Sequence, residues 1–184
     1  MALTLIKEDG TGKVDANAYA SAADGDAYHD GHLYASAWTA ATLANKETAL
    51  VFATRLIDSQ YQFGGSRANE TQALQWPRVN CVDPDKASVP AITSLLLADP
   101  FVSANAVPKA VIQAACEMAR ELLVVDRTAA PAGEGLKYQN SGTTQTGYDK
   151  KDTRPVISLV AQAMLAKYGA MIKSRSGVVR LVRA

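Results

Sequence analysis

The most constraining feature of this sequence is a patterned apolar stretch, residues 42–78, which a pair of glycines interrupts. Thr42 is the expected N-cap of a helix, and Gly64-Gly65 is its expected end. Apolar residues between them recur at steps of three and four, which places them on one face of that helix. They are Ala49, Leu50, Ala53, Leu56, Ile57 and Tyr61. The stretch therefore predicts an amphipathic helix with one buried face.

A second, short turn is expected after the glycines; it carries Gln72, Ala73, Leu74 and Trp76, and Pro77 ends it. A tryptophan at the end of a short segment packs back on the nearest helix, so we expect Trp76 to lie against Leu56 or Tyr61. An exposed tryptophan at a partner interface is the alternative. Arg78 is either the partner of a salt bridge or an interface residue.

The second long helix is expected to open at Val107-Pro108, because proline suits the first helical turn. Glu117, Arg120 and Glu121 fall outside its apolar stripe. Many alanines lie on that stripe, which predicts a close approach to the helix of residues 42–63. The members of the stripe are Val111, Ala114, Ala115, Met118, Ala119, Leu122 and Leu123.

Two shorter helices are expected before and after this pair. The first lies within residues 17–32, with Ser21 as its N-cap. Its buried side is expected to hold Tyr19, Ala23, Ala27 and Tyr28. The last helix begins at Pro155 and ends near Gly169. Its apolar register runs through Val156, Leu159, Val160, Ala163 and Met164.

These elements predict a mainly α protein: a small helical bundle around two long helices, with an extended loop or β-hairpin insertion and a C-terminal arm. We expect a helical core at residues 1–127 and an exposed loop or hairpin at 128–153, centred near Asn140-Ser141-Gly142. Residues 154–184 would form the last helix and a docking arm. No apolar run approaches the ~20 residues of a membrane span, and no signal peptide is evident.

Charge is distributed unevenly along the chain, although the formal net charge is only +1. The first thirty residues are acidic, and no acidic residue follows Thr153. The basic end contacts an acidic or nucleic-acid neighbour, or the acidic start of another copy, or solvent alone. Residues 178–182 are β-prone and read as a docking strand or tail. The candidate partner-binding residues are Arg78, Lys173, Arg175, Arg180, Leu181 and Arg183.

The sequence contains no catalytic motif that we recognise: no nucleophile elbow, no paired-histidine zinc helix and no dinucleotide fingerprint. The loop Asp9-Gly10-Thr11-Gly12 lacks the Lys-Ser/Thr of a phosphate loop, so a turn is expected there. His29 and His32 have the spacing of two metal ligands but no third ligand, so we expect the end of a surface helix instead. We therefore expect no enzyme, no cofactor and no bound metal. The cysteines, Cys81 and Cys116, are too few for a disulfide framework.

The order of short motifs along residues 5–126 resembles a known family. The motifs are Glu8-Asp9-Gly10-Thr11-Gly12, Ala16-Asn17-Ala18-Tyr19, Asp26-Ala27-Tyr28, Trp38, Ala41-Thr42, Lys46-Glu47, Ala53-Thr54-Arg55, Ile57-Asp58, Tyr61, Gly65-x-Arg67, Gln72-Ala73-Leu74-x-Trp76-Pro77-Arg78 and Val107-Pro108. The chain is similar to the small helical head-to-tail connector (adaptor, or head-completion) proteins of tailed phages. Members of this family are often labelled DnaT-like proteins that bind single-stranded DNA. The segment after Thr128 departs from the resemblance.

This resemblance implies a structural virion protein at the capsid vertex or neck, assembled in the host cytoplasm. Connectors of this type form a ring, commonly of twelve copies, beneath the portal protein. The ring extends the channel for packaged double-stranded DNA and gives tail or neck proteins a surface to attach to. No membrane partner is implied.

The alternative function is that of a single-stranded DNA-binding protein. Such proteins need a basic groove with stacking aromatic side chains. Here the basic residues gather at the C-terminal end, where Tyr168 is the aromatic residue. The other aromatics fall within the patterns expected for the core.

Overall fold

The computed structural model of the chain describes residues 3–86, 100–129, 136–140, 145–148 and 154–172. Its helices are α1 (Ala22–His29), α2 (Ser36–Thr39), α3 (Leu43–Gln60), α5 (Lys109–Val124) and α6 (Leu159–Leu165). Its strands are β1 (Tyr61–Phe63), β2 (Ser66–Arg67), β3 (Arg78–Val79), β4 (Leu136–Asn140), β5 (Gln145–Tyr148) and β6 (Gly169–Met171). These strands form two-stranded antiparallel sheets with the orders β1-β6, β2-β3 and β4-β5. The described part of the chain is thus mainly helical, with small sheets.

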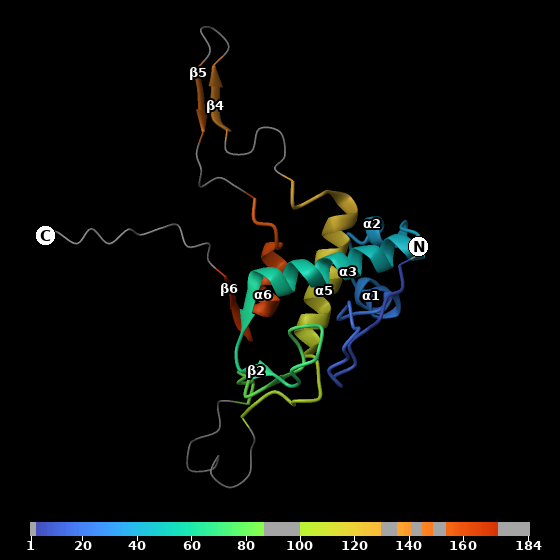
Figure 1. Ribbon diagram of the computed structural model, residues 1–184. Coiled ribbons are helices and arrows are strands. Elements are labelled where there is room, and N and C mark those ends of the chain that lie inside the picture. Colours follow the sequence, from blue (N-terminus) through green and yellow to red (C-terminus); the bar gives the residue numbers. More distant parts are fainter. Residues whose placement is uncertain (1–2, 87–99, 130–135, 141–144, 149–153, 173–184) are drawn as a thin grey trace, which may run out of the picture.

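Helix α5 lies at the centre of the core, where it contacts α1, α2, α3 and α6 (Figure 1). The stripe predicted for α3 is confirmed, because all six of its apolar members are buried. Thr42 caps α3 as predicted, its side chain accepting a hydrogen bond from the Asn45 N–H at 3.3 Å. A bundle around two long helices is not confirmed, since α6 and the β1–β6 pair also pack into the same core.

The end of α3 differs from the sequence prediction. The helix stops at Gln60 and the chain runs directly into β1, so Gly64-Gly65 turns the chain from β1 to β2 rather than ending the helix. Gly65 has φ +68°, and a Cβ there would lie 2.1 Å from the Val79 carbonyl oxygen. Residues 70–77, for which a short turn was predicted, form an irregular segment.

Trp76 is fully buried, which confirms its predicted burial but not the predicted packing against Leu56 or Tyr61. Its ring contacts Phe63 and Tyr168 edge-on, with centroid distances of 5.5 and 5.8 Å. Tyr168 leads into β6, and β6 pairs with β1 so that Tyr61 lies opposite Met171. The tryptophan therefore joins the end of α3 to the C-terminal part of the described chain, a contact that the sequence did not predict.

Helix α6 begins at Leu159, with Ser158 as its N-cap, and not at Pro155 as predicted. Its buried positions are Ala161 and Leu165, whereas Leu159 is 71% exposed and Val160 51%. The predicted register of this helix is therefore wrong. Only one narrow side of α6 meets α5, so two large apolar residues remain at the surface.

Helix α1 has the predicted N-cap, since Ser21 and Asp24 form a reciprocal capping box. Its predicted buried side is confirmed at Tyr19 and, in part, at Tyr28, which packs against the core. It is wrong at Ala23 and Ala27, which are exposed, while Gly25 and His29 are the buried positions of the helix. The cause is Trp38 of α2, whose ring lies where a side chain at position 25 would be.

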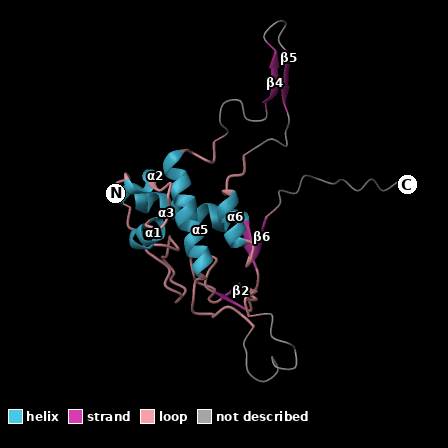
Figure 2. Ribbon diagram, turned by 180° about the vertical axis from the view of Figure 1, so that it is seen from behind, coloured by secondary structure: helices cyan, strands magenta, loops and turns pink. Residues whose placement is uncertain are grey.

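The insertion is a β-hairpin, one of the two forms left open by the sequence. Strand β4 pairs with β5, with Asn140 opposite Gln145. The hairpin stands apart from the helices in both views (Figures 1 and 2). The β-prone residues 178–182 lie outside the described residues. Within the described part, no helix is long and apolar enough to cross a membrane.

Gly25→Ala should destabilise the fold. The added Cβ would lie 2.3 Å from the Trp38 ring, which is itself 1% exposed and cannot move aside freely. Overpacking of this kind costs about 1–3 kcal/mol, measured as the change in unfolding free energy in urea. Gly31→Ala is the matched control, because a Cβ there meets nothing within 4 Å. Equal stabilities of the two variants would contradict the packing described here.

Candidate functional site

The loop at residues 9–13 closes around a buried carboxylate. Glu8 is 1% exposed, and its carboxylate oxygens accept hydrogen bonds from the N–H groups of Gly10, Gly12 and Lys13 at 2.8, 2.9 and 2.8 Å. Converging backbone N–H groups of this kind form an anion site in phosphate-binding loops. Here the protein supplies its own anion, so the structure agrees with the prediction that this loop is a turn.

Arg78, the first candidate partner-binding residue, lies inside the protein at 7% exposure. Its guanidinium donates hydrogen bonds to the carbonyl oxygens of Gly64 and Gly65, both at 2.7 Å, and of Phe63 at 3.3 Å. It also donates to the carbonyl and the side-chain oxygen of Gln75, both at 3.0 Å. All of its hydrogen-bond acceptors in the described structure are thus uncharged. Arg78 holds the β1–β2 turn against the segment before Pro77.

A second buried connection joins Tyr19 to Asp58 of α3. The Tyr19 hydroxyl donates to one oxygen of this carboxylate, and the other accepts from the Gln75 N–H at 3.0 Å. The same hydroxyl accepts from the Trp76 N–H at 3.3 Å. Burial raises the pKa of Asp58 from its ordinary 3.8 to about 6, and burial also raises the pKa of Tyr19. Asp58 and Tyr19 thus bind the backbone N–H groups of Gln75 and Trp76. Arg78 binds the Gln75 carbonyl oxygen of the same segment.

The charged residues of α5 are more deeply placed than the sequence predicted. Glu117 is 2% exposed, and Arg120 binds it and Glu121, each at 2.6 Å. Arg127 contacts Glu121 at 3.2 Å and donates to the Val156 carbonyl at 2.8 Å. The sequence placed Glu117, Arg120 and Glu121 outside the apolar stripe of the helix. They instead form a chain of ion pairs that ties α5 to the segment entering α6.

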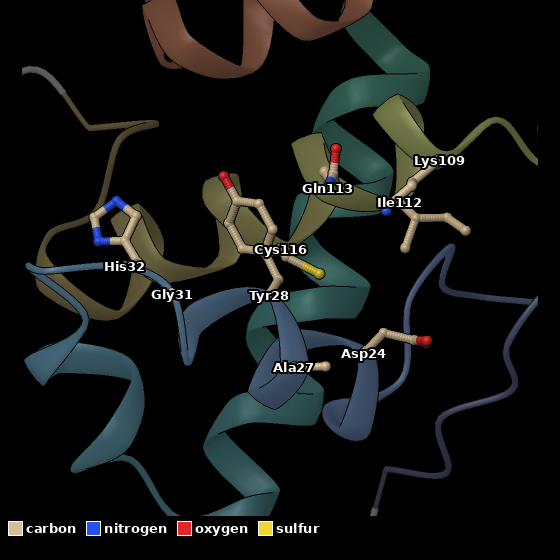
Figure 3. A pocket seen from close by; sticks show the side chains of 9 residues that line it. All are labelled: Asp24, Ala27, Tyr28, Gly31, His32, Lys109, Ile112, Gln113 and Cys116. Carbon is tan, nitrogen blue, oxygen red and sulfur yellow. The ribbon is translucent and has the colours of Figure 1, made fainter.

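A pocket of about 530 Å³ lies between α1 and the first half of α5 (Figure 3). Residues from the two helices and the turn after α1 surround it, and the labelled side chains of Tyr28 and Gln113 come from facing elements. Its lining is Asp24, Ala27, Tyr28, Gly31, His32, Lys109, Ile112, Gln113 and Cys116. The pocket is therefore lined by both polar and apolar side chains.

Three of the groups that line this pocket are already engaged or unreactive. Asp24 forms an ion pair with Lys7 at 2.7 Å. His32 accepts a hydrogen bond from the Tyr34 N–H at 3.0 Å. Burial raises the pKa of the Cys116 thiol to about 12, so it stays protonated and is not a nucleophile near neutral pH. The pocket therefore offers a binding surface, with no activated nucleophile among these groups.

The two histidines lie close together but do not form a metal site. Their ring centroids are 5.9 Å apart, and His29 is buried against Trp38 while its Nε2 lies 3.2 Å from the Cys116 carbonyl oxygen. The sequence placed His29 at a surface helix end, which its 3% exposure shows to be wrong. Among the described residues, no group of three or more His, Cys, Asp or Glu side chains is arranged to hold a metal ion.

An apolar groove of about 340 Å³ runs between α3 and the C-terminal end of α5. Phe52 is 36% exposed on its wall, and the exposed Val124 and Val125 follow Leu123 at the end of α5. The lining consists of Leu3, Asn45, Thr48, Ala49, Val51, Phe52, Arg55, Leu122 and Leu123. The groove gives the compact core an open apolar face, which in proteins marks an interaction surface.

The remaining candidate partner-binding residues are Lys173, Arg175, Arg180, Leu181 and Arg183, and all of them lie outside the described residues. Their role stays a prediction. Arg78, by contrast, is described, and its hydrogen bonds are to groups of its own chain.

The pH dependence of stability should change when Asp58 is replaced by Asn. The folded-state pKa of about 6 exceeds the ordinary 3.8, so the folded protein holds this proton more tightly than the unfolded chain. The resulting stabilisation is complete below pH 3.8 and is lost as pH rises through about 6. It amounts to about 3 kcal/mol.

Unfolding free energies of the wild type and Asp58→Asn, measured between pH 4 and pH 7, check this expectation. The advantage of the wild type over the variant should shrink as pH rises. A difference that stays constant with pH would show that Asp58 does not have the raised pKa that burial gives it.

Comparison with known proteins gives one family. The family described as "Putative DnaT-like ssDNA binding protein" matches residues 3–184. No curated protein and no solved structure matches the chain. The family description agrees with the second of the two functions expected from the sequence, and it does not confirm the connector relationship. Because the match covers nearly the whole sequence, the chain belongs to this DnaT-like family.

Proposed function

We propose that this chain is a structural virion protein that forms the ring-shaped head-to-tail connector beneath a phage portal. The observation that carries the proposal is the open apolar groove between α3 and α5, on a core in which the buried Arg78 and Glu8 are hydrogen-bonded within the chain. A ring requires one surface patch to bind a different patch of the next copy. The groove supplies a patch of the right character for such a contact.

The other exposed features suit the same role. The β4–β5 hairpin stands apart from the helices, where it can reach a neighbour or the channel (Figure 2). The basic C-terminal residues would contact the portal protein, and a further surface would receive tail or neck proteins. Packaged double-stranded DNA would pass through the ring, commonly of twelve copies, at the capsid vertex or neck. Assembly would take place in the host cytoplasm.

The proposed role requires no catalysis, cofactor or metal. Its chemistry is recognition between protein surfaces, in which apolar contact supplies most of the free energy and charge sets the orientation. The acidic N-terminal region and the basic C-terminal region would provide that orientation between copies.

Single-stranded DNA binding is the second candidate function, and the family description favours it. A strand binder uses stacking aromatic side chains beside basic residues. In the described structure Trp38, Tyr61, Phe63 and Trp76 are buried and so are unable to stack on bases. Tyr34 is 77% exposed, the most of the aromatic side chains whose burial the structure describes, so it is the one of these best placed for stacking; its ring centroid lies 6.4 Å from that of His32.

Light scattering on the purified protein, alone and mixed with its portal protein, tests the connector proposal. We expect a ring-sized species in at least one of the two samples. Phe52→Asp should abolish this species, because a carboxylate in the groove must be desolvated without a partner. Val14→Asp is the control: Val14 is 68% exposed and does not line the groove, so assembly should be unchanged.

The second function is tested by titrating a single-stranded oligonucleotide at several salt concentrations. A protein that stays monomeric with the portal, binds the strand with an affinity that falls steeply with salt, and loses affinity in Tyr34→Ala would overturn the connector proposal. A ring without DNA affinity would exclude strand binding as the main function.

A further inference from the structure

The turn between α1 and α2 carries the two most exposed large apolar side chains of the described residues. Leu33 is 93% exposed, and Tyr34, its neighbour in the chain, is 77% exposed. A single exposed apolar residue is normal at a protein surface, but adjacent ones form a patch, and such patches mark interaction surfaces. The α1–α2 turn, residues 30–34, is therefore a candidate docking surface.

Hydrogen bonds within the α1–α2 turn hold it in one shape. The His32 N–H donates to the His29 carbonyl oxygen at 3.0 Å, and the Tyr34 N–H donates to the His32 Nδ1 at 3.0 Å. The His32 Nε2 lies 3.8 Å from the Glu117 carboxylate of α5, which positions the turn on the core. A surface that is ordered before binding loses less conformational freedom when it meets a partner.

The charges of the α1–α2 turn and of the apolar groove are complementary. Asp30 is exposed on the turn. Arg55 is exposed in the groove and is the one charged side chain among the described residues that line it. Neither of the two forms an ion pair with another described residue. The groove thus combines an apolar wall with an unpaired cation, and the turn combines apolar side chains with an unpaired carboxylate.

Two other pairs of adjacent apolar residues are exposed in the described part of the chain, and both fit the groove less well. The pair at 124–125 directly follows Leu123, which lines the groove, so it belongs to the groove's own edge. The pair at 159–160 lies in a part of the sequence where no acidic residue follows Thr153, so that part has no carboxylate for Arg55. The α1–α2 turn is the pair that matches the groove in both apolar character and charge.

We propose that the α1–α2 turn of one copy docks in the apolar groove of the next copy. Leu33 and Tyr34 then lie against Phe52. Asp30 pairs with Arg55 beside them. No residue of the turn lines the groove of its own chain, so each copy offers both surfaces at the same time. A contact between two different patches repeats from copy to copy and closes into a ring when the rotation allows it. The inference rests on the proposed function and adds which residues form the contact between copies.

The two parts of this contact have different effects. The apolar side chains leave water together, and their burial stabilises the contact. The ion pair forms between side chains that are exposed in the single copy, so it selects the orientation of the copies and speeds their association more than it adds affinity. Reversing one of the two charges brings like charges together and should weaken the contact, whereas reversing both restores the attraction.

Cysteine cross-linking of the full chain, alone and mixed with its portal protein, tests the contact. Asp30→Cys with Arg55→Cys in one chain places thiols at two positions that meet across the contact, while the apolar side chains stay in place. We expect a bifunctional maleimide to join successive copies, which gives a ladder of covalent multimers on a denaturing gel. Val14→Cys with Arg55→Cys is the control that should give no ladder, because Val14 is exposed but lies outside the turn. The native Cys81 and Cys116 are buried and do not compete.

The other outcomes separate this contact from the proposed function. An assembled species without a ladder, or an equal ladder in the control, would overturn the contact and leave the connector proposal standing. Covalent dimers alone would show a contact between two identical patches and would also overturn the inference. A ladder without a ring would support the contact and count against the connector. The absence of both assembly and ladder would overturn both.

Charge reversal gives a second measurement that needs no new thiols. Asp30→Arg and Arg55→Asp should each raise the protein concentration at half assembly about tenfold in light scattering, because like charges then face each other. The two substitutions in one chain should restore the wild-type value.

Asp15→Arg is the control for charge reversal: Asp15 is exposed but lies outside the turn and the groove, so assembly should not change. A double variant that assembles no better than the single ones would contradict the pairing of Asp30 with Arg55. None of these variants changes Tyr34, so an effect on strand binding stays separate from an effect on assembly.

Discussion

The guanidinium of Arg78 is the point where three parts of the fold meet. It binds the carbonyl groups of the β1–β2 turn and of Gln75, and the segment between them carries Trp76 into the core. Tyr19 and Asp58 hold the same segment from the N-terminal side and from α3. With Trp76 fixed in this way, Tyr168 packs on its ring and β6 is aligned with β1. The hydrogen bonds of this guanidinium have to be complete, because a buried cation without partners costs several kcal/mol.

The polar residues of this chain that look functional in the sequence are therefore mainly internal. Glu8 fills its own loop, Arg78 and Asp58 hold the tryptophan segment, and Glu117 joins the ion pairs of α5. What the core leaves for recognition is its described surface, which includes the apolar groove beside Phe52 and the β4–β5 hairpin. Polar groups that are used inside the fold, together with an apolar surface that is left open, are what we expect of a protein that binds other macromolecules.

Sequence reasoning succeeded where one periodic pattern decides the outcome. The caps at Thr42 and Ser21 and the buried stripe of α3 follow from local rules, and the structure has them. The sequence predictions were wrong where contacts between segments that are distant in the chain determine the structure. The packing of Trp38 makes Gly25 a buried position, and pairing with β6 converts the end of α3 into a strand. The burial of Glu117 depends on Arg120 and on the segment before α6, which helical spacing alone does not show.

The most direct test of this account is the unfolding free energy of Arg78→Lys, measured in urea. An ammonium group cannot reach the carbonyls that the planar guanidinium binds together, and each buried group left unpaired costs about 1–3 kcal/mol, so a loss of roughly 3 kcal/mol is expected. Arg67→Lys is the control, because Arg67 is exposed on β2 and its replacement should change little. Unchanged stability of Arg78→Lys, with weaker partner binding, would show that Arg78 is an interface residue and would contradict the account.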